Sequence, residues 1–192
     1  MNTLILASTS AYRKQLLERF GLPFEVARPE TDETPLPDET PDALAIRLAI
    51  AKARAIADHK PNALVIGSDQ VACIGNEIFG KPGTIERAHA QLRRMSGQDV
   101  IFHTAVAVIN SDTGKVQSTL VPTHVRFRTL TTDEIERYVA AELPLDCAGS
   151  AKSEGLGITL LDALSGDDPT ALIGLPLIAL SRMLRNEGIA LP

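Results

Sequence analysis

The pattern of apolar and polar positions predicts a chain in which strands and helices alternate. Short apolar runs at 4–7 and 63–66 are expected to form buried strands, and the second should end at Gly67, where polar residues take over. Longer runs at 100–108 and 116–127 are expected to pair as a hairpin. This alternation indicates an α/β protein rather than an all-helical or all-β one.

Capping residues mark where the helices are expected to begin. Thr40 followed by Pro41 is typical of a helix start, and Thr84 and either Thr131 or Thr132 are expected to cap two further helices. The predicted helices cover about 11–20, a long segment from 41, 84–95, 133–141 and a C-terminal segment from about 176.

Two other segments affect the expected organisation. Residues 29–39 are acidic and rich in proline, so we expect a loop there, and no other segment resembles a linker. The glycine-rich region 149–161 is expected to contain a strand. With 192 residues, 44% of them hydrophobic, the chain can bury one sizeable core. A single domain over residues 1–192 is therefore expected.

Composition and charge exclude several classes of protein. The formal net charge of −5 opposes binding to nucleic acid polymers, which requires a basic face. The amino-terminal residues lack the charged region of a signal peptide, and no apolar stretch reaches the roughly 18 residues that would span a membrane. Cys73 and Cys147 lack neighbours at zinc-ligand spacing, so we expect buried, reduced thiols and a cytoplasmic location.

The first candidate for chemistry lies where the strand at 4–7 meets the following helix. Ser8 and Ser10 supply hydroxyl groups, the helix start supplies backbone N–H groups, and Arg13 adds a planar set of donors. Together these groups have the outline of an anion site. The alternative, a capping cluster beside a solvated arginine, remains open.

Two lysines are the second candidate. On the long helix, Lys52 lies roughly 140° from Arg47 and among apolar residues, so its ammonium must either extend to the edge of that face or meet an anion. Lys81 lies between Gly80 and Pro82, and Gly-Lys pairs recur at phosphate sites, although the P-loop pattern is absent. Alone, Lys81 would be read as an exposed turn lysine. The two lysines together favour a phosphate site.

Carboxylates are the third group of candidate residues for chemistry. Asp69 follows the strand at 63–66, at the position where α/β sheets present ligand-contacting residues, and Asp32 and Glu33 lie in the acidic loop. Two carboxylates near a polyphosphate are suited to a divalent ion and to activation of water. An isolated aspartate in a turn is more often a backbone cap, so the hypothesis rests on the combination.

The order of these residues resembles the Maf family of nucleotide pyrophosphatases along essentially the whole chain. The matching segments are Leu6-Ala7-Ser8-Thr9-Ser10 with Arg13, Asp32-Glu33-Thr34, Lys52-Ala53, Gly67-Ser68-Asp69-Gln70, Gly80-Lys81-Pro82 and Gly149-Ser150 to Gly155. The chain departs from the family pattern at Ala11, where many relatives have proline, and at Ala51, where many have glutamate.

The resemblance implies an inosine-triphosphatase-like α/β fold, in which a mixed, elongated sheet is flanked by helices and a cleft separates two lobes. It also implies hydrolysis of a nucleoside triphosphate to the monophosphate and pyrophosphate with a divalent cation such as Mg²⁺ or Mn²⁺. The implied roles are proton acceptor and metal ligand for Asp69, metal ligand for Glu33, and phosphate binding for Ser8, Ser10, Arg13, Lys52 and Lys81.

Within the family, the chain most resembles the YceF-like branch, which hydrolyses 7-methylguanosine triphosphate. Three residues suggest this resemblance: Tyr12, Gln70 and Glu154. Methylation gives guanine a positive ring on which the Tyr12 ring can stack, and Glu154 can accept hydrogen bonds from the guanine edge. A preference for another base, such as that of dTTP or UTP, stays open. A non-catalytic role as a nucleotide-binding regulator of septum formation also stays open, as does a homodimer.

Overall fold

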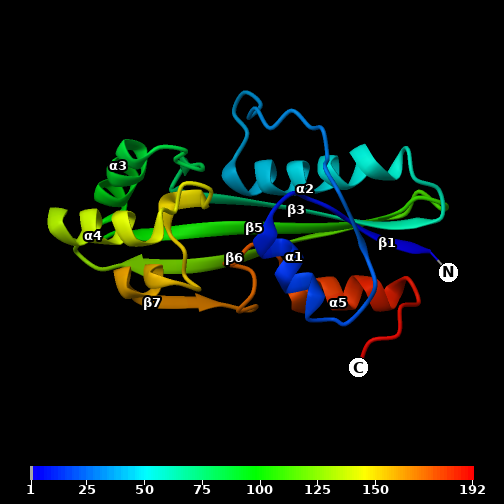
Figure 1. Ribbon diagram of the computed structural model, residues 1–192. Coiled ribbons are helices and arrows are strands. Elements are labelled where there is room, and N and C mark those ends of the chain that lie inside the picture. The colour runs from blue at the N-terminus through cyan, green and yellow to red at the C-terminus, as the bar shows by residue number, and fades with distance from the viewer. Residues whose placement is uncertain (1) are drawn as a thin grey trace. The chain divides into compact units, whose positions relative to one another are not determined.

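Residues 2–192 are described by a computed structural model, in which a mixed sheet of seven strands is flanked by helices (Figure 1). The strands are β1 (Thr3–Ala7), β2 (Glu25–Ala27), β3 (Ala63–Ile74), β4 (Glu77–Phe79), β5 (Asp99–Asn110), β6 (Val116–Phe127) and β7 (Leu161–Gly166). The α-helices are α1 (Ala11–Glu18), α2 (Pro41–Ala57), α3 (Ile85–Met95), α4 (Thr132–Glu142) and α5 (Leu177–Asn186), and the 3₁₀ helices are η1 (Ala148–Ser150) and η2 (Leu156–Leu160). The expected α/β fold is confirmed.

Helices begin where the capping residues predict them. Ser10, Thr84 and Thr131 each accept a hydrogen bond from a backbone N–H in the first turn of α1, α3 and α4, respectively. Thr40 occupies the N-cap of α2 without a side-chain bond, and Pro41 is the first residue of that helix.

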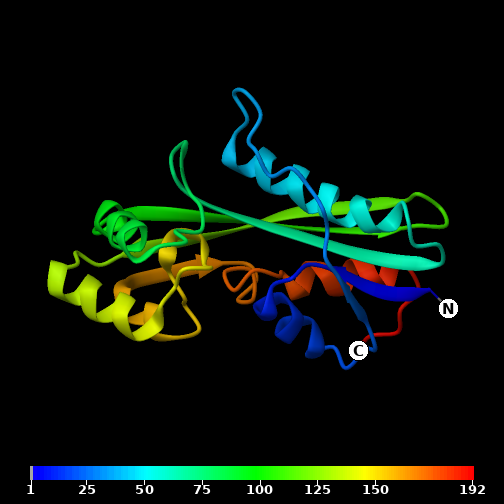
Figure 2. The same ribbon diagram turned by 45° about the horizontal axis from the view of Figure 1, so that its top comes forward.

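The first compact unit contains the residues up to Asp69, Thr104–Val121 and Asp168–Pro192. Within it, β1 lies between β2 and β3 and is parallel to both, so its side chains alternate between two covered faces. Leu4 and Leu6 pack with α1 and α5, whereas Ile5 and Ala7 pack with α2 (Figures 1 and 2). Burial on both faces explains why these strands are continuous apolar runs in the sequence.

The second compact unit contains Gln70–His103 and Pro122–Asp167. Helices α3 and α4 pack against each other in it, and two antiparallel pairs form, β4 with β3 and β7 with β6. The long strands β3, β5 and β6 each contribute residues to both units. The single domain expected over residues 1–192 stays a prediction.

Strand β3 is longer than the sequence suggests. It continues to Ile74, so the end expected at Gly67 is wrong and Asp69 lies inside the strand. A Cβ at Gly67 would lie 2.1 Å from the carbonyl oxygen of Ala49 on α2, so the glycine permits a close approach of helix and strand and does not end the strand. The polar residue Ser68 that follows is fully buried.

The glycine-rich region after α4 also differs from expectation. Gly149 and Ser150 have positive φ angles of 66° and 55°, which are incompatible with an extended strand. The strand expected within 149–161 is therefore wrong, and β7 begins only at Leu161. The sequence pattern did not predict the three-residue strands β2 and β4.

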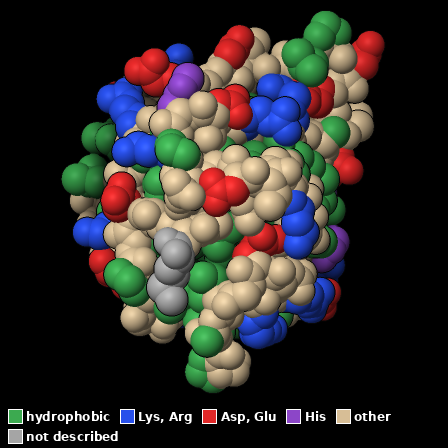
Figure 3. Space-filling view, turned by 90° about the vertical axis from the view of Figure 1, so that its right-hand side faces the viewer, with side chains coloured by type: hydrophobic (Ala, Val, Ile, Leu, Met, Phe, Trp, Pro, Cys, Tyr) green, Lys and Arg blue, Asp and Glu red, His purple; other side chains and the backbone are tan. Residues whose placement is uncertain are grey.

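The cysteines, the surface charges and the helices can be compared with what the composition predicts. Cys73 and Cys147 are both free of disulfides, as expected, although only Cys73 is buried and Cys147 is half-buried. Acidic and basic side chains are interspersed on the face drawn in Figure 3. Within residues 2–192, every helix is too short or too polar to cross a bilayer.

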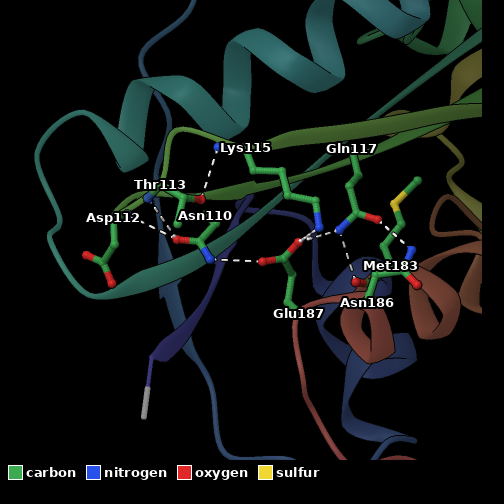
Figure 4. A network of polar contacts seen from close by, with 8 residues as sticks. All are labelled: Asn110, Asp112, Thr113, Lys115, Gln117, Met183, Asn186 and Glu187. Atoms are coloured by element: carbon green, nitrogen blue, oxygen red, sulfur yellow. Dashed lines mark hydrogen bonds and ion pairs between the residues drawn. The ribbon is translucent and has the colours of Figure 1, made fainter.

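A polar network joins the turn between β5 and β6 to the end of α5 (Figure 4). The Glu187 carboxylate accepts hydrogen bonds from Asn110 Nδ2 at 2.9 Å and Gln117 Nε2 at 2.8 Å, and it lies 2.7 Å from Lys115 Nζ. Burial raises the pKa of Glu187, but the donors from Asn110, Lys115 and Gln117 outweigh that effect and leave the pKa below its ordinary value. The ionised carboxylate therefore stabilises the first unit.

Replacing Glu187 with alanine is expected to lower the free energy of unfolding by about 1–3 kcal/mol, because the buried amide of Asn110 loses its acceptor and the half-buried amide of Gln117 loses one of two. Since the folded-state pKa is lowered, the ionised carboxylate contributes fully above the unfolded-state pKa, and the contribution is lost as the pH falls toward the folded-state value. Urea unfolding of Glu187→Ala and the parent at neutral pH and at about pH 3 measures both effects. Glu136→Ala, at an exposed position of α4, is the control. An equal loss at the two pH values would contradict the pKa assignment.

Candidate active site

A buried lysine joins two carboxylates in the first unit. Lys52 Nζ lies 2.6 Å from Asp69 Oδ1 and 2.7 Å from Glu33 Oε1. The side chains of Lys52 and Asp69 are 9% and 10% exposed, whereas that of Glu33, in the loop 29–39, is 59% exposed. Of the two fates that the sequence left open for Lys52, the structure shows that the ammonium meets anions.

Helix α2 and strand β3 position this cluster. A Cβ at Gly67 would lie 2.7 Å from the backbone nitrogen of Ala53, so the strand meets the helix beside Lys52 and two residues before Asp69. The close contact buries the Asp69 carboxylate, and a carboxylate removed from water needs a cation or hydrogen-bond donors. Lys52 supplies that cation.

Arg13 adds a second positive charge to the same region. It lies in the first turn of α1, and its Nε donates a hydrogen bond to the carbonyl oxygen of Gly174 at 2.9 Å. Burial lowers the pKa of the Arg13 guanidinium, and the negative charges of Asp69 and Glu33 oppose that shift. An arginine keeps its charge at neutral pH, so two cations and two carboxylates act on one another here.

The hydroxyl groups of Ser8 and Ser10 belong to the turn that leads into α1. Ser8 Oγ accepts a hydrogen bond from the Ser10 N–H at 3.1 Å, and Ser10 Oγ accepts one from the Arg13 N–H at 3.4 Å. The capping role is therefore confirmed. It does not prevent phosphate binding, because a hydroxyl that accepts a hydrogen bond can still donate its own proton.

The two adjacent acids of the loop 29–39 have different surroundings. Asp32 is exposed, its Oδ1 accepts the Thr34 N–H at 2.9 Å, and hydrogen bonds from Thr34 lower its pKa. Glu33 instead reaches the lysine of the cluster. Arg47 fastens the loop to α2, since it donates to the Thr34 carbonyl oxygen at 3.1 Å and to both carboxylate oxygens of Glu39.

The remaining predicted site residues lie elsewhere on the chain. Tyr12 is half-buried on α1 in the first unit. Gln70, Lys81 and Glu154 belong to the second unit, where Gln70 is half-buried in β3, Lys81 is exposed between β4 and α3, and Glu154 is exposed between η1 and η2. Ser8, Ser10, Arg13, Glu33, Lys52 and Asp69 thus all belong to the first unit. The catalytic, metal-binding and substrate-binding roles of all ten residues stay predictions.

Sequence reasoning missed a buried serine and a carbonyl group behind this cluster. Ser68 Oγ lies 2.8 Å from the carbonyl oxygen of Ala105 and 2.9 Å from that of Gly174, which also accepts from Arg13. The Gly174 carbonyl thereby links the strand that carries Asp69 to the arginine. A hydroxyl inside an apolar strand was the available signal for Ser68, whereas no local pattern marks Gly174.

The two carboxylates fit a divalent cation that is bound together with a polyphosphate. Within residues 2–192, groups of three or more His, Cys, Asp or Glu side chains arranged for a metal ion are absent. Mg²⁺, however, commonly takes only one or two carboxylates and completes its shell with phosphate oxygens and water. Asp69 and Glu33 already share one cation, the Lys52 ammonium, and each carboxylate has further lone pairs. These two residues are therefore the candidate metal ligands.

Comparison with known proteins assigns the chain to a family. The family described as Maf-like protein matches residues 3–187. A protein from Aromatoleum aromaticum named 7-methyl-GTP pyrophosphatase is 70% identical over 189 residues, which cover 98% of this chain and 97% of that protein. Proteins of the same name from a Polaromonas species and from Xanthomonas campestris pv. campestris are 62% and 60% identical, over 98% and 100% of this chain and 86% and 100% of their own lengths.

Proposed function

Because the chain belongs to the Maf family, we propose that it hydrolyses 7-methyl-GTP to 7-methylguanosine monophosphate and pyrophosphate. The observation that carries this proposal is the buried cluster in which Lys52 bridges Asp69 and Glu33 beside Arg13. Such a cluster offers cations to phosphate oxygens and a carboxylate to water. The names of the full-length relatives support the choice of substrate.

In this reaction the oxygen of a water molecule attacks the α-phosphorus, and the bond from that phosphorus to the bridging oxygen breaks. Asp69 accepts the proton of the water, and the electron pair leaves with pyrophosphate. Asp69 and Glu33 would hold a divalent ion, which would supply charge neutralisation and Lewis-acid assistance to the attacking water. Arg13 and Lys52 offset the phosphate charge, and Ser8 and Ser10 donate hydrogen bonds to phosphate oxygens.

We also propose substrate-binding roles for four further residues, which are Tyr12 of the first unit and Gln70, Lys81 and Glu154 of the second. Lys81 adds a cation for the triphosphate, and Gln70 contributes a polar contact to the substrate. The Tyr12 ring stacks on the positively charged 7-methylguanine, and the Glu154 carboxylate accepts from the N1–H and the amino group of the base. We further propose Mg²⁺ or Mn²⁺ as the metal and the cytoplasm as the location, and a homodimer stays a prediction.

The base preference provides the test of this function. The parent protein is expected to hydrolyse 7-methyl-GTP with a higher kcat/KM than GTP, and to act poorly on dTTP and UTP. Tyr12→Ala should narrow the gap between methylated and plain guanine roughly tenfold, the equivalent of about 1.4 kcal/mol of cation–π energy, whereas Tyr12→Phe should retain most of it. Glu154→Gln should weaken the binding of both GTP and 7-methyl-GTP, because an amide cannot accept hydrogen bonds from two adjacent donors as a carboxylate does.

Competition between 7-methyl-GTP and GTP in one assay, with pyrophosphate release measured in Mg²⁺ or Mn²⁺, gives these ratios directly. Equal hydrolysis of the two nucleotides would contradict the proposed preference for 7-methyl-GTP, but it would still be consistent with the pyrophosphatase reaction. Nucleotide binding without pyrophosphate release would instead contradict the proposal that the protein is a pyrophosphatase.

A further inference from the structure

The turn that carries Lys81 is fastened from behind by a network inside the second unit. The carbonyl oxygen of Gly80, one residue before Lys81, accepts hydrogen bonds from the Gly149 N–H at 3.3 Å and from Gln91 Nε2 at 3.0 Å. The other end of the same amide, Gln91 Oε1, accepts from Ser150 Oγ at 2.6 Å. One glutamine side chain on α3 thus joins two segments that lie about seventy residues apart in the sequence.

Ser150 has a backbone conformation that serine rarely adopts. Its φ is 55°, directly after Gly149 with φ of 66°, and a left-handed conformation is sterically unfavourable for a residue with a Cβ. Three hydrogen bonds hold Ser150 there: its N–H donates to Cys147 at 3.1 Å, its carbonyl oxygen accepts from the Tyr138 hydroxyl at 3.1 Å, and its Oγ donates to Gln91. The surrounding structure therefore determines this strained conformation.

Packing alone does not require a serine at this position. Glycine adopts the same φ without a steric cost and would place no hydroxyl in the interior, where Ser150 is fully buried. What serine adds is a donor aimed at Gln91 Oε1. Because the Ser150 hydroxyl bonds Oε1 of the Gln91 amide while Nε2 at its other end donates to the Gly80 carbonyl oxygen, the amide ties Ser150 to Gly80.

We propose that Ser150 and Gln91 are positioning residues that fix the backbone at Gly80 and thereby place Lys81 for binding to the triphosphate of the substrate. This inference rests on the phosphate-binding role of Lys81 in the proposed function. The segment 149–155 matches the family pattern, but the resemblance implies no role for Gly149 or Ser150. The proposal assigns a role to Ser150.

A double-mutant cycle on Ser150 and Lys81 tests the proposal. The probe is inorganic tripolyphosphate with Mg²⁺, and calorimetry gives its Kd for the parent, Ser150→Gly, Lys81→Ala and the double variant. Each single change is expected to weaken binding about tenfold or more, and the double variant should bind no more weakly than Lys81→Ala. If Ser150 affects binding independently of Lys81, the two losses will multiply, and if it acts only on stability, Ser150→Gly will leave the Kd unchanged. Either result would overturn the proposal.

Glycine is chosen at position 150 because it separates strain from the hydroxyl. Ser150→Gly relieves the left-handed strain, which offsets the loss of the hydrogen bond to Gln91, so its melting temperature should stay close to that of the parent while phosphate binding weakens. Gln91→Glu keeps an acceptor for Ser150 and removes the donor to Gly80, so it should reproduce the loss of Ser150→Gly. A loss of binding that accompanies lower stability in both variants would count against a positioning role.

Ser96→Ala is the matched control. The Ser96 hydroxyl also belongs to the second unit and accepts the Leu130 N–H at 2.7 Å, but it has no bond to Gly80 or Gln91. Its removal is expected to leave the Kd for tripolyphosphate unchanged. The binding cycle does not depend on turnover, so a parent protein that fails to release pyrophosphate would contradict the proposed function only. An unchanged Kd in Lys81→Ala would overturn the inference itself.

Discussion

Asp69→Asn is expected to abolish pyrophosphate release while the protein still folds and binds nucleotide. The substitution keeps the size of the side chain, and an asparagine oxygen can still accept the hydrogen bond that Lys52 Nζ donates to Asp69 Oδ1 at 2.6 Å. It removes the charge that accepts a proton from water and binds the metal. General-base catalysis contributes about 10²–10⁴-fold, so kcat should fall at least a thousandfold once the effect on the metal is added.

Stability should change little, because Lys52 retains a charged partner in Glu33 at 2.7 Å. The experiment measures kcat at saturating 7-methyl-GTP and Mg²⁺, the melting temperature, and the Kd for the nucleotide. Asp58→Asn, at the exposed C-terminal end of α2, is the control and should behave like the parent. Turnover of Asp69→Asn within about tenfold of the parent would contradict the role of Asp69 as proton acceptor.

Sequence reasoning predicted the elements whose signals are local. Thr84 caps the helix it was expected to cap, Thr131 is the cap of the two threonines considered, and each predicted apolar run lies within a strand. The lysine on the apolar face of α2 was also informative, because a buried ammonium must meet an anion. These predictions succeed because each depends on a few neighbouring residues.

Other features could not be read from local pattern because distant parts of the chain determine them. Gly67 looked like the end of a strand. A glycine is needed there because the backbone of α2 at Ala49 lies too close for a Cβ. Ser150 looked like part of an extended segment, but the hydrogen bond that its hydroxyl donates to Gln91 Oε1 and the one that its carbonyl oxygen accepts from the Tyr138 hydroxyl hold it at positive φ. The choice of Glu33 over its neighbour Asp32 likewise depends on how the loop lies against α2.

Lys52→Met is expected to raise KM and lower kcat, and to destabilise the fold at the same time. The kinetic loss follows from removing a cation that lies among the phosphate-binding groups, and it should amount to about 2–5 kcal/mol in kcat/KM, or roughly 30- to 5000-fold. The loss of stability follows because Asp69, which is buried, is left without its ammonium partner. Methionine preserves the length of the stem, so the change creates little cavity.

A second substitution separates the two effects. The Lys52 ammonium offsets two carboxylates, so removing one of them in Lys52→Met/Glu33→Gln reduces the remaining repulsion and should recover part of the lost melting temperature. It should not recover kcat, because both a phosphate-binding cation and a metal ligand are then missing. Lys52→Arg is the charge-retaining control and should preserve more activity than methionine. If Lys52→Met had parental kinetics, Lys52 would serve only to neutralise Asp69 and Glu33, and its assignment to phosphate binding would be wrong.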